Sequence, residues 1–335
     1  MSPLPSISVI IPVFQASAFI DTCLQSLVSQ DYTGEMECIL VDDCGTDDSM
    51  DKVRRFIDSY KGNIVFRLGA NDRNKGAAAA RNTGLALAEG EYVFFLDSDD
   101  LLPADALSAL AAPLRERRYD MVVGKYEESQ PLSEPCPSLP DGTVLEGADV
   151  LRAYLRKQLS VIVCSKLYRT SFIRESRLDF VEGIIYEDDL WSFQAAVVAG
   201  SLYVVDRVTY YYTIHPGSVM TSTVLQKRIR SFLTVIREMY RYGVEHGLRN
   251  RADFHHRIEQ YRLNLLRVLL DDKSLFNETY RSVRQSVPKP WKECFRLDGM
   301  RLNKQVRDFH LALPVKAGAA WMRGWFKAEA LLKGL

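Results

Sequence analysis

Short, almost purely apolar segments alternate with amphipathic segments over roughly the first 125 residues of this chain. The apolar segments are rich in β-branched residues, which is typical of strands buried on both faces of a sheet. The amphipathic segments repeat their apolar residues every three or four positions, which is typical of helices. Strands that alternate with helices usually pair in parallel. The pattern therefore predicts an α/β domain with a doubly wound, mostly parallel sheet flanked by helices.

The expected strands lie at residues 7–13, 38–41, 64–68 and 91–96, and the expected helices at 18–30, 50–60 and 77–88. Pro12 should end the first strand, because proline cannot donate a hydrogen bond to a central ladder. Ligands of open α/β sheets bind beyond the carboxyl ends of the strands. Pro12, the pair Asp42 and Asp43, and the segment 97–100 fall at such ends, so we expect the functional site there.

The pattern changes further along the chain. Residues 127–147 are rich in Pro, Ser and Glu and are expected to form a surface loop, after which helix and strand signals continue to about residue 213. From residue 225 onward the pattern is mainly helical and rich in arginine. We therefore expect an α/β domain at residues 1–224. A helical C-terminal region at 225–335 would contact a binding partner, a membrane or another subunit.

The formal charge of the chain is zero, but the charge is unevenly distributed. Residues 1–224 contain 20 Lys and Arg against 32 Asp and Glu, whereas residues 225–335 contain 23 against 11. An acidic first part suits a metal site and argues against a nucleic-acid groove, so we expect no nucleic-acid partner. The basic second part suits an anionic surface, although solvated helix faces would show the same excess.

The cysteines and the N-terminal sequence bear on the compartment. The six cysteines show no Cys-x-x-Cys spacing, so we expect neither disulfides nor a zinc site, and a reducing compartment is favoured. The chain shows no signal peptide and no apolar run of the roughly 18–20 residues that a spanning helix needs. We therefore expect a cytoplasmic protein, either soluble or attached peripherally to the inner face of the membrane.

The acidic segment Asp97-Ser98-Asp99-Asp100 directly follows an expected buried strand. Carboxylates two positions apart at a strand end can project into one crevice, where their charges repel. A divalent cation such as Mn²⁺ or Mg²⁺ would relieve that repulsion. A solvated acidic turn would show the same spacing, so the segment alone leaves both interpretations open.

Four ordered motifs together resemble the family 2 glycosyltransferases of the GT-A fold, a family of inverting enzymes that use nucleotide sugars. The motifs are Val9-Ile10-Ile11-Pro12-Val13, Val41-Asp42-Asp43 with Asp47, Asn74-x-Gly76 with Ala80-Arg81-Asn82-x-Gly84, and the stretch from Gly90 to Asp100. The resemblance covers about residues 6–220 and leaves the C-terminal third uncovered. It implies transfer of a sugar from a nucleotide-diphosphate donor, with a UDP-sugar expected, to a glycan or lipid-linked acceptor. The expected context is polysaccharide or glycolipid biosynthesis in the cell envelope.

The resemblance also implies roles for individual residues around the donor. The residues expected to contact the nucleotide sugar are Pro12, Val13, Asp42, Asp43, Asn74, Gly76, Arg81, Asn82, Asp97, Ser98, His215 and Ser218. Asp97, Asp99 and His215 are the expected metal ligands. Asp42 could instead form a turn, Arg81 could be a structural ion-pair partner, and His215 could be structural. Thr213 stands where relatives often carry an arginine, which weakens the assignment of this segment to the phosphates.

A second acidic cluster lies at Glu187-Asp188-Asp189. Inverting transfer needs a carboxylate that accepts the proton of the attacking hydroxyl. By resemblance Asp188 is the expected base, with Glu187 beside it and Asp189 as a rival. Acidic residues in the first turn of a helix also stabilise that helix without any catalysis, and this interpretation stays open. Lys166 and Trp191 are expected to contact the acceptor.

Two other functions are alternatives at this point. A nucleotidyltransferase of similar fold would carry a Gly-rich phosphate loop with a basic residue after the first strand, whereas Phe14-Gln15-Ala16 stands there. A non-catalytic nucleotide-sugar-binding protein would need no base at positions 187–189. Both alternatives therefore fit the sequence less well than a glycosyltransferase does.

The last 15 residues predict an amphipathic helix. On a helical wheel Trp321, Trp325, Ala328 and Leu332 share one side, flanked by Met322 and Phe326, and basic residues lie opposite. Such a stripe suits an interfacial helix on an anionic membrane. It equally suits a helix that packs on the transferase domain or on a second subunit of a homodimer, and the sequence leaves these choices open.

Overall fold

The computed structural model describes residues 3–129, 136–215, 224–286 and 306–333. The chain forms two compact units, Met1–Ser222 and Thr223–Leu335, and each is described here by itself. The role expected for the second unit, contact with an acceptor, a membrane or a subunit, stays a prediction.

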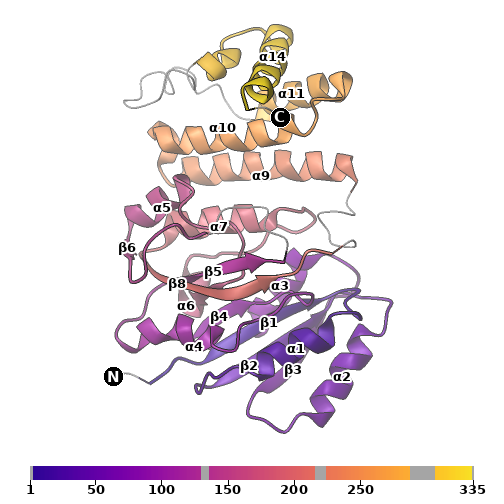
Figure 1. Ribbon diagram of the computed structural model, residues 1–335, viewed down its shortest axis with the longest axis vertical. Helices are drawn as coiled ribbons and strands as arrows, with labels where there is room; N and C mark the ends of the chain where they lie inside the picture. The colour runs from indigo at the N-terminus through magenta and orange to yellow at the C-terminus, as the bar shows by residue number, and fades with distance from the viewer. Residues whose placement is uncertain (1–2, 130–135, 216–223, 287–305, 334–335) are drawn as a thin grey trace. The chain divides into compact units, whose positions relative to one another are not determined.

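Within the described part of the first unit, eight strands form one sheet. They are β1 (Ile7–Val13), β2 (Met36–Asp42), β3 (Val65–Ala70), β4 (Tyr92–Phe95), β5 (Met121–Glu128), β6 (Val144–Glu146), β7 (Lys166–Arg169) and β8 (Ser201–Tyr212). Their order across the sheet is β3-β2-β1-β4-β7-β5-β8-β6 (Figure 1). The four strands predicted in the first 100 residues are confirmed within a few residues at each end.

The first four strands pair in parallel, with β1 between β2 and β4 and with β3 outside β2. The second half of the sheet is mixed, because β7 runs antiparallel to both β4 and β5 while β5 and β8 are parallel. The short strand β6 pairs antiparallel with β8. The expectation of an uninterrupted loop at residues 127–147 was therefore wrong at its two ends, since β5 and β6 extend into it.

Pro12 does not end β1, because it pairs with Val41 inside the strand. The reason is that successive residues of a strand direct their backbone N–H and C=O groups alternately to the two neighbouring strands. The carbonyl of Ile10 accepts a hydrogen bond from Leu96 on the β4 side, whereas the carbonyl of Val13 accepts one from Asp43 on the β2 side. Residue 12 therefore faces the β4 side, where pairing has already stopped at Ile10. A missing N–H costs no ladder bond at that position.

The helices of the first unit are α1 (Ile20–Val28), α2 (Ser49–Ser59), α3 (Ala77–Leu87), α4 (Ala106–Ala111), α5 (Ala148–Leu155), α6 (Thr170–Glu175) and α7 (Glu187–Val198). Helix α3 packs on β1, β2 and β3. A side chain at Gly84 would collide with Ile10 of β1, so this glycine lets α3 approach the sheet closely. Close packing of α3 sets the position of Arg81, one turn earlier on the same helix.

The second unit contains the helices α9 (Leu225–Glu245), α10 (Ala252–Arg267), α11 (Lys273–Ser286) and α14 (Val315–Lys333). Helix α14 buries Met322 and Phe326 in a core that includes Phe276 and Tyr280 of α11. The wheel had placed these two α14 residues at the flanks of the apolar stripe. Trp321, which the wheel placed at its centre, is 37% exposed. In the parts of the chain that the structure describes, no helix is long and apolar enough to cross a membrane.

Candidate active site

Arg81 of α3 joins two acidic segments that are about 90 residues apart in the chain. Its guanidinium donates to Asp97 Oδ1 over 2.7 Å, to Glu187 Oε1 over 2.8 Å and to Asp188 Oδ1 over 3.0 Å. Asp97 follows the carboxyl end of β4, and the other two acids open α7. Arg81 therefore contacts both Asp97, which is expected to contact the nucleotide sugar, and Asp188, the expected base.

The guanidinium of Arg81 is buried, and its charge lies 5.4 Å from the centre of the Phe180 ring. Burial alone would lower the pKa of Arg81, but the carboxylates of Asp97, Asp188 and Glu187 raise it well above its ordinary value. One cation faces three carboxylates, so the cluster carries an excess of negative charge. The structure thus shows the ion-pair role of Arg81, and its contact with the nucleotide stays a prediction.

Asp188 lies in the first turn of α7, and both of its carboxylate oxygens are held. Oδ1 accepts from Arg81, and Oδ2 accepts a hydrogen bond from the backbone N–H of Val163 at 3.3 Å. Burial raises the pKa of Asp188 to about 7, and the nearby Arg81 cation opposes that rise. A carboxylate with such a pKa is suited to accept a proton near neutral pH.

The neighbours of Asp188 are placed differently. Glu187 binds Arg81, and the backbone carbonyl of Asp189 accepts a hydrogen bond from the Tyr154 hydroxyl at 3.2 Å. Tyr186 immediately before α7 has a φ of 68°, a left-handed conformation that turns the chain into the helix. The Arg81 contact distinguishes Asp188 from Asp189, its rival for the role of base.

Asp99 and His215 form a second polar pair beyond the carboxyl ends of the strands. His215 Nε2 lies 2.8 Å from Asp99 Oδ2, and its ring packs 4.4 Å from the ring of Phe19. The side chains of Asp97 and Asp99 are 29% and 33% exposed. Burial, followed by the charge of Asp97, raises the pKa of Asp99, whereas the bond to His215 lowers it. The ligand atoms of Asp97, Asp99 and His215 do not all lie within 4.8 Å of one another, so only Asp99 and His215 are brought together here. Carboxylates and an imidazole are nevertheless donor types that suit Mn²⁺ or Mg²⁺.

Asp100 has a role that the sequence did not suggest. Its buried carboxylate accepts a hydrogen bond from the Tyr210 hydroxyl at 2.5 Å and another from the Thr213 N–H at 2.7 Å. These contacts fasten the end of β8 to the acidic turn and bring His215 beside Asp99. Burial and the charges of Asp97 and Asp99 raise the pKa of Asp100 to about 8. The only sequence signal was a third acid next to the motif.

Asp42 is the last residue of β2 and Asp43 follows it, and both carboxylates accept hydrogen bonds from the backbone. Asp43 is buried and accepts hydrogen bonds from the N–H groups of Lys75 at 3.0 Å and Gly76 at 2.7 Å. Asp42 Oδ1 accepts from the Cys44 N–H at 2.9 Å, which makes it a turn former. In this structure Asp43 fixes the segment before α3, and its contact with a nucleotide base stays a prediction.

The remaining donor residues are distributed as follows. Pro12 and Val13 are buried at the end of β1, and Asn74 is exposed. Ser98, which stands between Asp97 and Asp99 in the sequence, is buried. Gly76 has a φ of 88° at the start of α3, a conformation that favours glycine. Ser218 lies outside the described residues.

Asn82 exchanges two hydrogen bonds with the backbone of Phe180. Its Nδ2 donates to the carbonyl at 2.9 Å, and its Oδ1 accepts from the N–H at 2.8 Å. Its side-chain amide is thus occupied in joining α3 to the segment before α7, and its contact with the nucleotide stays a prediction.

The structure places both residues assigned to the acceptor in the interior of the domain, and their contact with an acceptor stays a prediction. Trp191 is 1% exposed, and its ring stacks on Phe180 at 4.1 Å in the core. Lys166 is 2% exposed, and its ammonium donates to the carbonyls of Ser160 and Ile162. Their side chains turn inward because the strand and the helix that carry them pack on the core.

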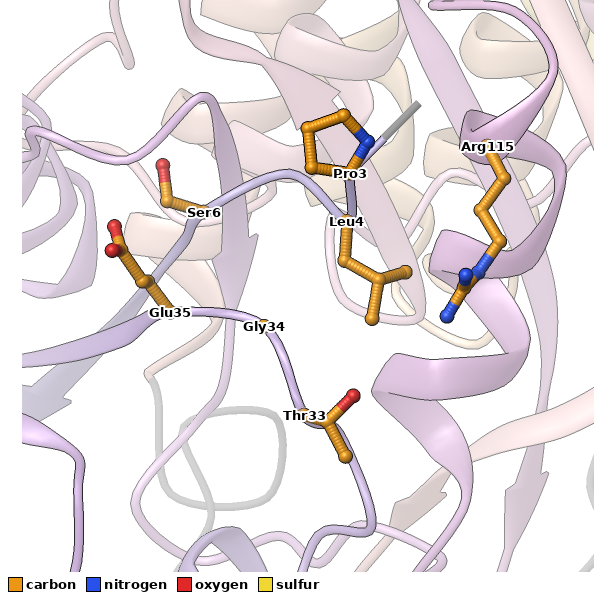
Figure 2. A pocket seen from close by; sticks show the side chains of 7 residues that line it. All are labelled: Pro3, Leu4, Ser6, Thr33, Gly34, Glu35 and Arg115. Carbon is orange, nitrogen blue, oxygen red and sulfur yellow. The ribbon is translucent and has the colours of Figure 1, made fainter. Parts of the chain in front are cut away.

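A hollow lies near the amino ends of β1 and β2, away from the carboxyl ends where the candidate site lies (Figure 2). It is lined by residues that precede β1 and β2, among them Pro3, Leu4 and Glu35, together with Arg115. Because ligands of such sheets bind at the carboxyl ends of the strands, this hollow is not the expected donor site.

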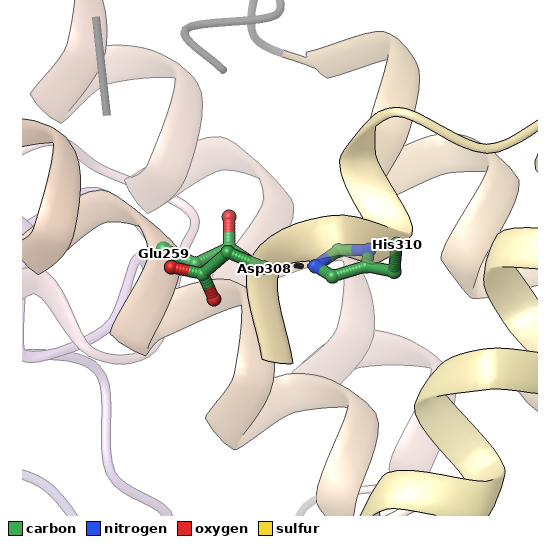
Figure 3. A group of neighbouring side chains, drawn as sticks. All are labelled: Glu259, Asp308 and His310. Carbon is green, nitrogen blue, oxygen red and sulfur yellow. Dashed lines mark hydrogen bonds and ion pairs between the residues drawn. The ribbon is translucent and has the colours of Figure 1, made fainter. Parts of the chain in front are cut away.

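One further acidic group lies in the second unit, where Glu259 of α10 meets Asp308 and His310 (Figure 3). It is the one set within the described residues whose three possible ligand atoms lie within 4.8 Å of one another. Arg262 pairs with Glu259 at 3.1 Å, and Arg307 pairs with Asp308 at 2.5 Å. Arginines already neutralise both carboxylates, so we interpret the group as a buried ion-pair network of the helical unit.

Comparison with known proteins agrees with this geometry. Residues 8–173 match the family described as glycosyl transferase family 2. Poly(ribitol-phosphate) β-N-acetylglucosaminyltransferase TarS of Staphylococcus aureus is 29% identical over 223 residues, which are 64% of this chain and 37% of TarS. The corresponding enzyme TarP of S. aureus is 28% identical over 270 residues, which are 79% of this chain and 80% of TarP. This chain thus spans little more than a third of TarS.

Solved structures show the same fold. The crystal structure of S. aureus TarS 1–349 in complex with UDP-GlcNAc superposes with a TM-score of 0.76 at 23% identity and covers 98% of this chain and 92% of that one. A mannosyltransferase from Pyrobaculum calidifontis, in complex with GDP-Man and Mn²⁺, has a TM-score of 0.56 at 18% identity and covers 98% and 87%. The predicted GT-A type α/β fold with a C-terminal helical region is confirmed.

Proposed function

This chain carries a glycosyl transferase family 2 domain over residues 8–173, and from that premise we propose that it moves a sugar from a nucleotide-diphosphate donor to an acceptor hydroxyl with inversion. The observation that carries the proposal is the link through Arg81 between Asp97 at the end of β4 and Asp188 at the start of α7. This link supports a site in which Asp97, the proposed contact of the nucleotide sugar, and Asp188, the proposed base, bind the same arginine side chain.

The proposed reaction is a single displacement. The acceptor hydroxyl attacks the anomeric carbon from the face opposite the nucleotide, and Asp188 takes its proton. Arg81 and the Val163 N–H each hold one oxygen of Asp188, so the carboxylate is oriented before the acceptor arrives. The sugar C–O bond to the nucleotide breaks as the new glycosidic bond forms, and the nucleotide diphosphate leaves.

We propose that Asp99 and His215, with Asp97 beside them, hold Mn²⁺ or Mg²⁺. Their fit to the ion rests on the donor types and on the crowding of carboxylates in the acidic turn, where Asp97 pairs with Arg81 and its charge, after burial, raises the pKa of Asp99. When bound, such an ion supplies charge neutralisation for the departing diphosphate.

The donor and the acceptor class are proposed from the relatives. TarS has been solved with UDP-GlcNAc and with UDP, which supports a UDP-sugar donor for this chain. The names of TarS and TarP specify poly(ribitol phosphate), an anionic polymer. The excess of basic residues in 225–335 would favour such an acceptor electrostatically. We therefore propose an anionic cell-envelope glycopolymer as the acceptor class.

A panel of nucleotide sugars tests the donor assignment by thermal shift, with and without Mn²⁺. Ligand binding to the native state raises the melting temperature, and a UDP-sugar is expected to raise it more when Mn²⁺ is present. Equal shifts for adenine, guanine and uracil nucleotides would contradict the assignment.

The rate of transfer should depend on pH through Asp188. The carboxylate acts as a base only when deprotonated, so kcat should fall by about tenfold per pH unit well below the pKa of about 7. The groups that act on its charge are Arg81, Glu187 and Asp97, together with the buried side chains of Lys166, Cys164 and Tyr168. The check is kcat at saturating donor between about pH 5.5 and pH 9. A kcat that stays level down to the acid end would exclude Asp188 as the base.

Peripheral membrane attachment through α14 is the finer proposal for localisation. Leu331 is 82% exposed, and with Trp321 it could enter an interface beside basic residues of the same helix. Replacing both by Ser should reduce co-sedimentation with anionic vesicles at low salt by about tenfold or more. Val268→Ser, an exposed apolar position on the same unit, is the matched control. Equal sedimentation of all forms would leave a second subunit as the partner of this surface.

A further inference from the structure

Lys166 is a buried charge that forms no ion pair within the described residues, although the nearby charge of Asp188 acts on its pKa. It begins β7 between β4 and β5, and its ammonium donates to two backbone carbonyls, at Ser160 over 2.8 Å and at Ile162. Among the residues that the structure describes, no carboxylate forms an ion pair with this ammonium. Burial lowers the pKa of Lys166 to about 8. A lysine kept at such cost, rather than an apolar residue of similar size, needs an explanation beyond packing.

The two carbonyls belong to residues 160–162, and the backbone carbonyl of each of these three residues accepts a hydrogen bond from a side chain. The carbonyl of Val161, between the two that Lys166 binds, accepts a hydrogen bond from the Ser192 hydroxyl at 2.6 Å. Ser192 is buried on α7, one turn beyond Asp188 and on the same side of the helix. Residues 160–162 are therefore fastened to β7 by Lys166 and to α7 by Ser192.

The next residue, Val163, binds the proposed base Asp188. The N–H of Val163 donates to Asp188 Oδ2 at 3.3 Å, while Arg81 holds Oδ1. The orientation of the carboxylate thus depends on a backbone N–H whose place is fixed by the three carbonyls before it. Removing the ammonium of Lys166 would free two of them.

We propose that Lys166 is a positioning residue for sugar transfer. Its ammonium fixes residues 160–162, and through the Val163 N–H this segment keeps Asp188 in the orientation that receives the acceptor proton. The inference rests on the proposed function of Asp188 as the base. It replaces the acceptor contact expected for Lys166 from the sequence.

A double-mutant cycle tests it. Lys166→Met keeps most of the side-chain volume and removes the donors, so kcat should fall by roughly 10–100-fold while the donor KM changes by less than about twofold. In an Asp188→Asn background the same substitution should change the residual rate by less than about threefold, because its effect passes through the lost carboxylate. Lys125→Met on the adjacent strand β5, which removes an ion pair with Asp206, is the matched control and should leave kcat unchanged.

The outcomes separate the inference from the proposed function. An equal loss in both backgrounds, or an unchanged kcat for Lys166→Met, would overturn the positioning role and leave the base assignment intact. A wild-type rate for Asp188→Asn alone would remove the base and the inference together. If Lys166→Met does not fold, as judged by melting and donor binding, Ser192→Ala loosens the same segment. It should then lower kcat by roughly 3–10-fold in the wild-type background alone, and an unchanged kcat would overturn the inference.

Discussion

Replacing Asp188 by Asn is expected to reduce kcat by roughly 10²–10⁴-fold, the usual contribution of a general base, while the donor affinity stays near that of the wild type. The amide has almost the same shape as the carboxylate, and its oxygen can still accept a hydrogen bond from Arg81 or from the Val163 N–H. It cannot take up the proton of the attacking hydroxyl. Single-turnover transfer rates, measured together with donor binding by calorimetry, check both halves of this expectation.

Asp189→Asn is the matched control for this substitution, because it is the adjacent residue of the same helix turn and makes the same chemical change. The Asp189 variant should be the milder of the two, since the Arg81 ion pair contacts Asp188. A variant at Asp189 that loses transfer, beside an active Asp188→Asn, would show that the other carboxylate is the base.

Replacing Asp99 by Asn is expected to abolish the metal-supported part of nucleotide binding. Asp99 and His215 lie 2.8 Å apart, and an amide in place of the carboxylate removes the charge that would hold a divalent cation there. Calorimetric affinity for UDP should weaken by about tenfold or more when EDTA replaces Mn²⁺ in the wild type, and should be weak in both conditions in the variant. Asp105→Asn, which removes a partly exposed carboxylate paired with Arg207, is the control that should behave as the wild type does. An Asp99 variant with an unchanged response to Mn²⁺ would place the metal elsewhere.

The local signals of the sequence predicted most of the first unit. The strand at Ile7–Val13 was predicted from a continuous run of β-branched residues, and the helix at Ile20–Val28 from the period of its apolar residues; both signals report burial along one element. The placement of the acidic turn beyond a strand end followed from the parallel order of the sheet. Pro12 was misjudged because its effect depends on which neighbour the residue faces, and that depends on where β4 stops.

The contacts that build the site could not be read from local pattern. Arg81 meets Glu187 and Asp188 across more than 100 residues, and only the packing of α3 against the sheet brings them together. The same holds for the Asp100 anchor that delivers His215 from the end of β8. Lys166 and Trp191 were assigned to the acceptor by resemblance to the family, which does not report how a side chain is oriented, and their orientation is set by the core.

Sugar transfer from a UDP-sugar is tested by measuring nucleotide release together with modification of an acceptor. The full chain is incubated with UDP-GlcNAc, Mn²⁺ and a poly(ribitol phosphate) acceptor, and the released nucleotide and the modified polymer are quantified by chromatography and mass spectrometry. We expect UDP release matched by sugar on the acceptor in the wild type, and little of either in Asp188→Asn. Release of pyrophosphate, or no turnover of any UDP-sugar in the panel, would contradict a glycosyltransferase.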